Sequence, residues 1–387
     1  MNGMRWVLLV AAAVIVGGMV TSSLTAPPGD WTMVVDWARS RRAEIEAQCV
    51  PCPVLTGEPI AADAIAGYAV AARLARSATR EGPERLRALL GDANAWPLTD
   101  GDRALLAALA PATSALREAT RAVGATSTSW DEVELHDLAT AAHATLVEAF
   151  AVPDVPALDR VLATLACGID LACTGGLVAQ FVGLQLVHDA LAACSDTRLA
   201  AVSGEGLAAF LASLTAAERV LPVQSPLPAH IVVRGISWLE SGVPIEPFEL
   251  GMNSAAGAWR HGFSARRSAM ARLAELAVEV QRFENEDRPD EAWATRQARL
   301  QALAAFDRAR NSDLRVPLLP AIVEAEERRR GAVAGLRLLR LALAVQLGVE
   351  LGPLVDPLSD APLLVERHAD RIVCRCPSGA QRTVARR

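Results

Sequence analysis

One glutamate and two histidines have the spacing in this sequence that is best suited to chemistry. Glu132, His136 and His143 follow one another at intervals of four and seven residues. On an α-helix such intervals place the three side chains on one face, where they could hold a metal ion or transfer a proton. A di-iron bundle would need a Glu-x-x-His segment on a second helix, which the sequence lacks. We therefore expect a solvated helix face here, with no metal, no catalytic residue and no cofactor.

Two acidic residues interrupt the most apolar part of the chain. Asp170 is the only charged residue from 161 to 187, and Asp189 follows that stretch beside His188. Buried carboxylates are usually hydrogen-bonded to a partner, so we predict that both are paired structural groups. Further along, Arg328-Arg-Arg330 follows three glutamates at spacings suited to i, i+4 ion pairs. That pattern predicts another solvated helix face.

The seven cysteines include two close pairs. Cys49-Val-Pro-Cys52 has the spacing of a thioredoxin pair, but a thioredoxin pair opens a helix, whereas this one follows a predicted helix. With Cys374 and Cys376 it could supply four thiolates to zinc, although the oxidising compartment that the N-terminal segment indicates favours disulfides. Cys374 and Cys376 lie two apart in a predicted strand, so their thiols share a face and do not bridge each other. We predict a disulfide between the two pairs, with a local Cys49–Cys52 bridge as the alternative.

The N-terminal segment is the strongest indication of where the protein is located. Residues 6–26 are uncharged and follow Arg5; at about 1.5 Å per residue, a helix of this length crosses a bilayer core of about 30 Å. A cleaved signal peptide is the alternative, because only residues 6–20 are strongly apolar. The positive charge before the segment, with Asp30 and Asp36 after it, places the body outside the cytoplasm. We predict a single-pass protein of a bacterial cell membrane, with residues 6–26 in contact with the lipid bilayer.

Hydrophobic periodicity predicts helices along nearly the whole body of the chain. Thr99-Asp-Gly-Asp102 and Ser129-Trp-Asp-Glu132 have the form of capping boxes, and Thr174-Gly-Gly176 indicates a turn between two core helices. The run Leu341–Val349 is apolar on every side, which predicts a central position in the bundle. The expected helices span 30–48, 61–79, 100–122, 130–151, two within 161–187, 204–219, 228–241, 254–284, 289–310 and 317–350.

The sequence changes character after residue 352. Val355–Pro362 is rich in turn-forming residues, and the alternating segments Leu363–Arg367 and Arg371–Cys376 predict a β-hairpin. The predicted fold is therefore all-α, a multi-helix bundle with a small C-terminal β-hairpin. Its predicted parts are an anchor (1–26), a helical body (27–352) with a candidate subdomain boundary at 243–253, and a turn and hairpin tail (353–387).

The tail carries the most specific resemblance in the chain. Asp356-Pro-Leu-Ser-Asp-Ala-Pro-Leu363 resembles the Asp-Pro-Phe-Ser-Gly-Lys-Pro-Leu tail of a group of bacterial exported proteins without assigned activity, and Gly176–Gly183 resembles a helix in their bodies. Those proteins have one N-terminal membrane helix and an Ala/Leu-rich helical body, so the resemblance implies an architecture but no activity. The major pseudopilins of type II secretion have a similar tail, but their leader carries a glutamate and residues 1–26 here contain no acidic residue. Here Leu358 replaces the phenylalanine of the group and Asp360 replaces its turn glycine.

Composition and motifs exclude several classes of function. The net charge of −6 is spread along the chain without a basic stripe, so we expect no nucleic-acid partner. All 38 cationic residues are arginine, which excludes a Schiff-base lysine and a P-loop lysine. The leading hypothesis is a membrane-anchored envelope scaffold or interaction module without catalytic activity, whose partner is an envelope protein. The alternatives are a hydrolase or metalloenzyme with a site made of scattered residues, and a binding protein for a hydrophobic small molecule.

Overall fold

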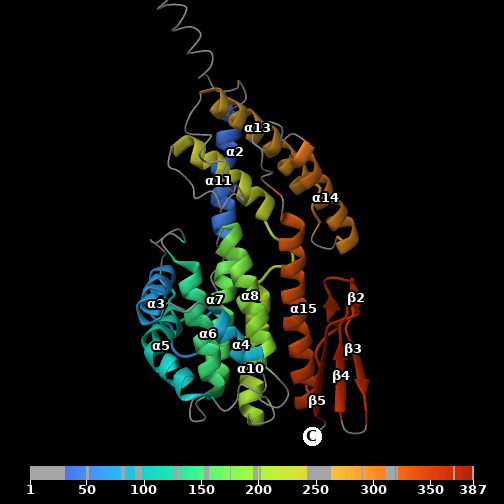
Figure 1. Cartoon of the computed structure of the whole chain (residues 1–387). Coiled ribbons are helices and arrows are strands. Elements are labelled where there is room, and N and C mark those ends of the chain that lie inside the picture. Colours follow the sequence, from blue (N-terminus) through green and yellow to red (C-terminus); the bar gives the residue numbers. More distant parts are fainter. Residues whose placement is uncertain are drawn as a thin grey trace, which may run out of the picture. The chain divides into compact units, whose positions relative to one another are not determined.

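The computed structural model is predominantly helical, with small β-sheets near the C-terminus (Figure 1). The chain forms two compact units, each made of two separate stretches of sequence. Unit 1 takes its described residues from 1–48 and 226–323, and unit 2 takes its own from 49–225 and 324–387. The predicted all-α class with a C-terminal β element is confirmed. The described residues are 31–48, 52–79, 83–91, 98–124, 130, 133–151, 157–174, 176–194, 199, 202–241, 263–288, 291–309, 319, 321–368 and 371–385.

The predicted membrane segment 6–26 and the candidate boundary 243–253 both lie outside the described residues. Among the helices that the structure describes, none is both long enough and apolar enough to cross a bilayer. The divisions between the two compact units fall after Gln48, Ser225 and Val323. The anchor, its orientation and the boundary at 243–253 therefore stay predictions.

Unit 1 is built from helices that pack through their apolar faces. The helix α11 packs against both α2 and α13, and α14 packs against α13. Polar contacts join segments that are far apart in the sequence: Trp31 Nε1 donates to Glu240 Oε1 at 2.8 Å, and Arg41 pairs with Glu284 at 2.6 Å. The described helices of unit 1 are α2 (Trp31–Gln48), α11 (Leu227–Ser241), α13 (Phe263–Asn285) and α14 (Trp293–Ala309).

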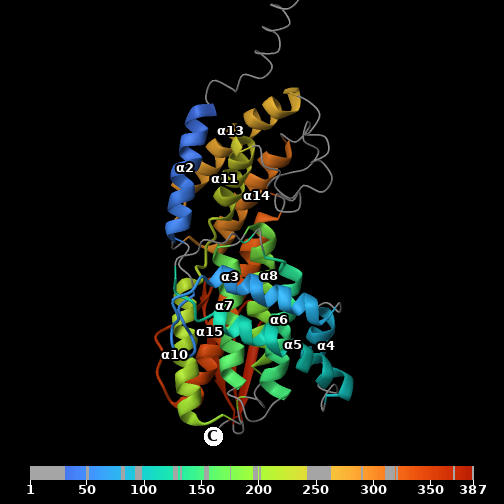
Figure 2. The ribbon, with the colours of Figure 1, turned by 90° about the vertical axis from the view of Figure 1, so that its left-hand side faces the viewer.

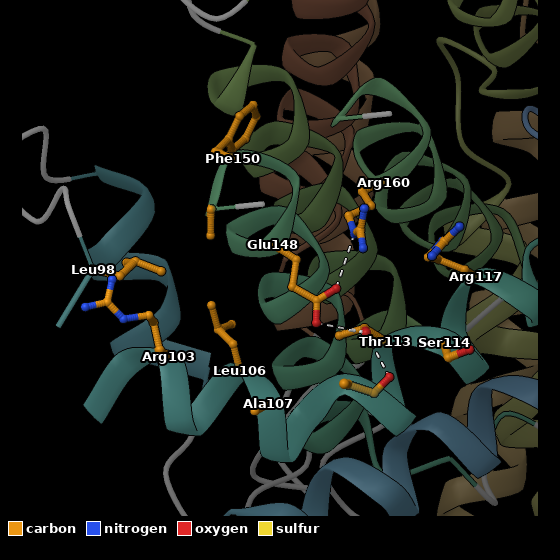
Figure 3. Close-up of a pocket in the computed structure, with 12 residues that line it drawn as sticks. Leu98, Arg103, Leu106, Ala107, Thr113, Ser114, Arg117, Glu148, Phe150 and Arg160 are labelled. Carbon is orange, nitrogen blue, oxygen red and sulfur yellow. Dashed lines mark hydrogen bonds and ion pairs between the residues drawn. The ribbon is translucent and has the colours of Figure 1, made fainter. Parts of the chain in front are cut away.

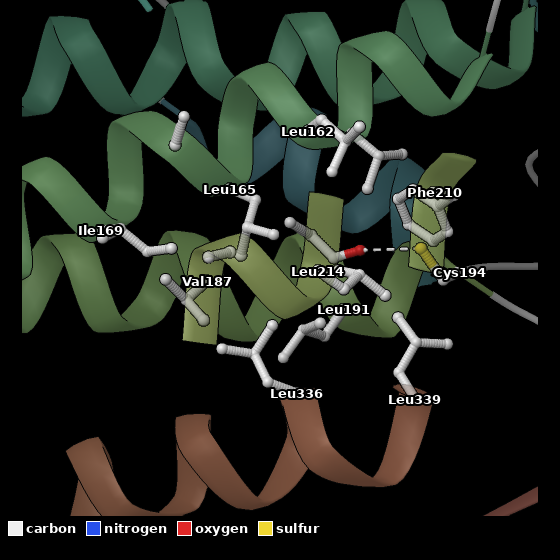
Figure 4. Close-up of a cluster of buried hydrophobic side chains, with 14 of the residues drawn as sticks. Leu162, Leu165, Ile169, Val187, Leu191, Cys194, Phe210, Leu214, Leu336 and Leu339 are labelled. Carbon is white, nitrogen blue, oxygen red and sulfur yellow. Dashed lines mark hydrogen bonds between the residues drawn. The ribbon is translucent and has the colours of Figure 1, made fainter. Parts of the chain in front are cut away.

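Unit 2 is organised around the helix pair α7 and α8. On one side of this pair, α3 packs against α5 and α6 over a core of leucines and alanines (Figure 2). On the other side, side chains of α7, α8, α10 and α15 meet in a second apolar cluster (Figure 4). The described helices are α3 (Ala64–Ala78), α4 (Pro83–Gly91), α5 (Asp100–Ala119), α6 (Leu135–Ala151), α7 (Ala157–Thr174), α8 (Leu177–Ala193), α10 (Gly204–Val220) and α15 (Ile322–Leu347), of which α15 begins in unit 1.

Two glycines allow α7 and α8 to approach closely. A Cβ atom added to Gly183 would lie 2.5 Å from the carbonyl oxygen of Gly168 and 2.6 Å from the backbone nitrogen of Ala172. Real Cβ atoms do not come this close to backbone atoms, so a larger residue at either glycine would push the two helices apart. The predicted turn at 174–176 is confirmed, because α7 ends at Thr174 and Gly176 caps the start of α8.

The helix α15 lies between the helices of unit 2 and the C-terminal sheet (Figure 1). Its Leu336 and Leu339 belong to the cluster with α7, α8 and α10, whereas Leu338 packs against Ile372 and Cys374 of the sheet. Within the run 341–349, the central position is confirmed only at Ala342, Leu343 and Ala344, which are buried in these two clusters, whereas the run becomes exposed at its end.

The predicted hairpin is confirmed, and a third strand extends it. The strand β4 pairs antiparallel with β3 and with β5, and the short strands β1 and β2 form a separate pair. The segment of β5 has the sequence Gln-Arg-Thr-Val-Ala, which lacks the apolar alternation that predicted the first two strands. The strands are β1 (Val355–Asp356), β2 (Ala361–Pro362), β3 (Leu364–Arg367), β4 (Arg371–Arg375) and β5 (Gln381–Ala385).

The turn between β1 and β2 is built on a buried carboxylate. Asp356 accepts hydrogen bonds from the Ser359 hydroxyl and from the backbone nitrogen of Ser378, each at 2.9 Å. These bonds outweigh burial and lower the pKa of Asp356. Asp360 has a φ of 55°, in the left-handed region that favours glycine, and it stands where the resembled tails have their glycine. Arg330 of α15 donates to a carbonyl of this turn at 2.7 Å, so the turn is fixed to the helix.

The predicted helix boundaries agree with the structure in most places, with two instructive differences. The capping box of Thr99 and Asp102 is present, with both reciprocal hydrogen bonds formed. The second predicted box, at 129–132, lies largely outside the described residues, and α6 begins only at Leu135. The helix α4 was not predicted, because its nine residues are too few to show a clear hydrophobic period.

Candidate functional site

A cavity of about 530 Å³ opens between α5, α6 and the start of α7 in unit 2 (Figure 3). Its apolar lining comes from Leu98, Leu106, Phe150 and three alanines. Its polar lining comes from arginines at 103, 117 and 160, from Glu148, and from the hydroxyls of Thr113 and Ser114. The cavity is therefore amphipathic, with room for a small molecule that has an apolar body and a polar end.

Three helices bring the polar side chains of this cavity together. Thr113 and Arg117 lie one turn apart on α5 and so project from the same face of that helix. Glu148 lies in the last turn of α6, and Arg160 lies in the first turn of α7. The polar centre thus depends on how the end of one helix meets the start of the next, and not on any local sequence motif.

Glu148 is at the centre of the polar lining and is buried. Its Oε1 lies 3.1 Å from the Thr113 hydroxyl, and its Oε2 accepts a hydrogen bond from Arg160 Nε at 3.2 Å. Burial raises the pKa of Glu148, since the charged form loses water. The bonds to Thr113 and Arg160 and the charge of Arg117 oppose this effect without cancelling it. The carboxyl is thus easier to protonate than an exposed glutamate.

Arg160 has a hydrogen-bonding group without an acceptor among the described residues. The residue is 8% exposed, and this group is its buried Nη1. Figure 3 shows its guanidinium above Glu148, with Arg117 on the same side of the cavity. Buried guanidinium N–H groups usually have an acceptor, from protein, water or ligand. This nitrogen therefore indicates where a ligand's acceptor atom would bind.

The arginines outnumber the carboxylates in the lining. Arg103 pairs with Asp100 at 2.9 Å outside the cavity, where both side chains are exposed. Asp159 is not among the lining residues; burial raises its pKa, and the nearby charges of Arg117 and Arg160 oppose this effect without cancelling it. Three arginines against one glutamate in the lining favour an anionic ligand group over a cationic one.

The three residues of the predicted face, Glu132, His136 and His143, do not share one outcome in the structure. Glu132 lies outside the described residues, and His136 is exposed. The expectation of a solvated face is wrong for His143, which is 3% exposed and lies 2.8 Å through Nε2 from Asp189. The reason is that α8 and the unpredicted α4 cover the middle of α6. The helix α4 also brings Arg87 to within 3.3 Å of the Asp189 carboxylate. Burial raises the pKa of Asp189, but the hydrogen bonds to His143 and Gln185 and the charge of Arg87 outweigh burial and lower this pKa.

Asp170 is a second buried carboxylate with defined partners, as predicted. Its Oδ2 accepts from the Tyr68 hydroxyl at 2.6 Å, and its Oδ1 accepts from the backbone nitrogen of Cys52 at 2.7 Å. Burial raises the pKa of Asp170 to about 6, although both hydrogen bonds act in the other direction. The Tyr68 ring stacks on Trp130 with centroids 5.6 Å apart. The group ties α3 and the segment before it to α7.

The candidate disulfide cysteines lie in separate places. Cys52 is a free buried thiol in the cluster of α7, α8 and α10, and Cys49 lies outside the described residues. Cys374 and Cys376 share one face of the sheet, as predicted, and that face packs on α15, so both side chains are buried. Within the described part of the chain Cys52 forms no disulfide, and the bridge between the two pairs stays a prediction because Cys49 is not described.

The arginine run on α15 also differs from its prediction. Arg328 is exposed and pairs with Glu324 at 2.7 Å, as the i, i+4 spacing predicted. The solvated face is wrong for Arg329 and Arg330, which are 1% and 2% exposed. Arg329 donates to the carbonyl of Ala172 at the end of α7, and Arg330 donates to the turn between β1 and β2.

The cavity residues were not among the sequence-predicted site residues. The available signal was weak: Glu148 is the single acidic residue in the apolar second half of α6, and Arg160 opens an equally apolar stretch. Within the described part of the chain, no group of three or more His, Cys, Asp or Glu side chains is placed to hold a metal ion. No known family model matches the chain, and no curated protein and no solved structure matches it either.

Proposed function

We propose that unit 2 is a binding module for a small amphipathic molecule that carries an anionic end. Of the functions that the sequence allows, the binding protein for a hydrophobic small molecule is the one that the cavity supports best. The observation that carries the proposal is the Arg160 side chain, which lines the cavity and whose buried Nη1 has no hydrogen-bond partner among the described residues. The apolar lining from Leu106 and Phe150 supports an apolar body for the same ligand.

The proposal is tested with hexanoate, whose chain is short enough to stay dissolved in water, and with uncharged hexan-1-ol. We expect hexanoate to bind the full-length chain and hexanol to bind at least about tenfold more weakly, since a charge-assisted hydrogen bond contributes about 1.5–3 kcal/mol. Binding is measured by ligand-observed NMR titration. Equal binding of the acid and the alcohol, or no binding of either, would refute the proposal.

A double variant locates the site. Arg160→Gln with Glu148→Gln removes both charges of the pair together, which avoids leaving one buried charge alone. Compared with Glu148→Gln alone, we expect the hexanoate affinity of the double variant to fall at least about tenfold for the loss of the cation. The matched control is Arg328→Gln with Glu324→Gln, an exposed pair 2.7 Å apart on α15 that should leave binding unchanged. An equal loss in both double variants would mean that the effect is not specific to the cavity.

The envelope location remains part of the proposal. The uncharged segment 6–26 and the charges on either side of it support a single-pass anchor with both units outside the cytoplasm. Carbonate extraction of the membrane fraction tests the anchor, and a reporter fused after residue 60 tests the orientation. Recovery of the full-length protein from the cytoplasm would exclude this location.

A scaffold role is the second candidate, and one observation favours it. Among the described strands, β3 pairs only with β4, and its Leu364 and Val365 are 51% and 38% exposed. An exposed strand edge with apolar side chains can pair with an extended segment of a partner protein. A photocrosslinker at residue 365 should then capture one envelope protein in cells, whereas a crosslinker at Val123, which is 61% exposed in the same unit, should not.

A further inference from the structure

The polar centre of the cavity has an unusual arrangement for an anion site, because its cation, Arg160, already pairs with a carboxylate of the protein, Glu148. Glu148 accepts from Arg160 Nε at 3.2 Å, while the unsatisfied nitrogen of Arg160 is Nη1. Nε and Nη1 lie on opposite edges of one guanidinium, so an anion bound at Nη1 would face the same cation that Glu148 already neutralises. Two carboxylates on one buried cation repel each other, and the repulsion raises the pKa of Glu148.

We infer that this site takes up one proton together with a monocarboxylate, and that Glu148 holds the proton. The inference rests on the proposed function, since it concerns the same cavity. The process balances as one ionised Glu148, one carboxylate anion from solution and one proton from water giving a complex in which Glu148 is protonated and the ligand is ionised. The ligand class is a singly charged carboxylate with an apolar tail.

Thr113 is suited to both protonation states of Glu148. Its hydroxyl lies 3.1 Å from Glu148 Oε1 and 3.0 Å from the backbone carbonyl of Ala110. A hydroxyl has one hydrogen and two lone pairs. It can therefore donate to an ionised Glu148, or turn its hydrogen to the Ala110 carbonyl and accept from a protonated one. No other change in the protein is required when Glu148 gains its proton.

The surrounding charges also allow the proton to be taken up near neutral pH. The charged groups that face Glu148 from the described elements are Arg117 on α5 and Arg160 on α7, with Asp159 beside both arginines and Arg103 at the cavity's other side. Burial already raises the pKa of Glu148 above its ordinary value despite the two arginines. A bound anion adds a negative charge and raises that pKa further.

The experiment counts protons in the wild-type full-length chain. Hexanoate is titrated by calorimetry at about pH 7 in two buffers with different ionisation enthalpies, because the difference in heat gives the protons taken up per ligand. We expect uptake approaching one proton and an affinity that rises by up to about tenfold for each unit of pH lowered between about pH 8 and pH 6. Hexanoate itself stays ionised in that range.

The variant Glu148→Gln provides the second measurement. Gln keeps the shape of the side chain and its acceptor for Arg160, but it cannot ionise. We expect its affinity for hexanoate to be independent of pH, and to exceed that of the wild type by about tenfold or more at pH 8, which corresponds to one unit of linked pKa. The control Glu324→Gln, on the exposed face of α15, should keep the pH dependence of the wild type.

The outcomes separate the inference from the proposed function. Hexanoate binding without proton uptake, with a Glu148→Gln variant that behaves like the wild type, overturns the inference and leaves the binding function in place. Tighter binding of hexyl phosphate than of hexanoate overturns the ligand class. Absence of hexanoate binding in both wild type and Glu148→Gln, when circular dichroism shows both to be folded, overturns the proposed function itself.

Discussion

Replacing Asp170 by Asn should remove one specific component of the pH dependence of stability. Asp170 is buried between Tyr68 and the backbone of Cys52, and its pKa is raised from 3.8 to about 6. Asn has nearly the same shape and keeps an acceptor for the Cys52 nitrogen, while its amide can donate to the Tyr68 hydroxyl. The variant therefore retains the packing and loses only the ability to ionise.

The direction of the effect follows from the raised pKa. Below pH 3.8 the carboxyl is protonated in both the folded and the unfolded chain, and its contribution to stability is complete. Between about pH 4 and pH 6 the unfolded chain releases the proton while the folded chain keeps it, so the stability falls as the pH rises. The shift of about two units corresponds to about 3 kcal/mol, at 1.36 kcal/mol per unit.

Urea denaturation from pH 4 to pH 7, followed by circular dichroism, measures this component. The difference in unfolding free energy, wild type minus Asp170→Asn, should fall by about 2.5 kcal/mol from pH 4 to pH 7, since a small part of the effect is lost below pH 4. Asp100→Asn, at a carboxylate whose side chain is 99% exposed, controls for the loss of an acid elsewhere in the unit. A difference curve for Asp170→Asn that is flat or rises with pH would show that burial does not dominate at this site.

Three further predictions concern packing, the tail and the thiols. Gly183→Ala should destabilise the protein by about 1–3 kcal/mol, because its Cβ would meet backbone atoms of α7. Gly331→Ala, with open space around it, should stabilise the protein by about 0.5–1 kcal/mol. Thermal unfolding compares the two variants. Asp360→Ala should be about 1–2 kcal/mol less stable than Asp360→Gly, since both variants lack the carboxylate and only Gly suits the positive φ. Equal denaturation midpoints would contradict this. The six described cysteines are Cys52, Cys167, Cys173, Cys194, Cys374 and Cys376, and all are buried. They should react with Ellman's reagent only after denaturation, and immediate reaction in the folded chain would contradict their burial.

The regular elements were largely predictable because their signals are local. The capping residues Thr99 and Asp102, the turn before Gly176 and the alternating tail each act over a few neighbouring residues. The third strand and α4 were missed because their stability comes from packing that a single segment does not reveal. The sheet is placed by contacts such as that between Leu338 and Cys374, which no local pattern indicates.

The candidate site was not predictable for a related physical reason. Glu148 and Arg160 form one ion pair, but they belong to different helices and each alone looks like an isolated charge in an apolar segment. His143 was misjudged because its exposure depends on α4 and α8, which lie elsewhere in the sequence. Arg329 was misjudged because helical spacing describes a face without saying what covers it. In each case the deciding partner lies far away along the chain or on an element that was not predicted.

The interleaved order of the two units has a consequence for synthesis of the protein. The helix α2 is made early, but its partners Glu240 and Glu284 follow 209 and 243 residues later. Synthesis adds about 5–20 residues per second. The apolar face of α2, which includes Trp31 and Val34, therefore lacks its partners α11 and α13 for roughly 10–50 s. Unit 2 waits as well, because α15 and its sheet are made after the second stretch of unit 1. Ribosomes that stall before residue 240 therefore carry a chain in which neither unit is complete, and these chains are the ones we expect to recruit chaperones.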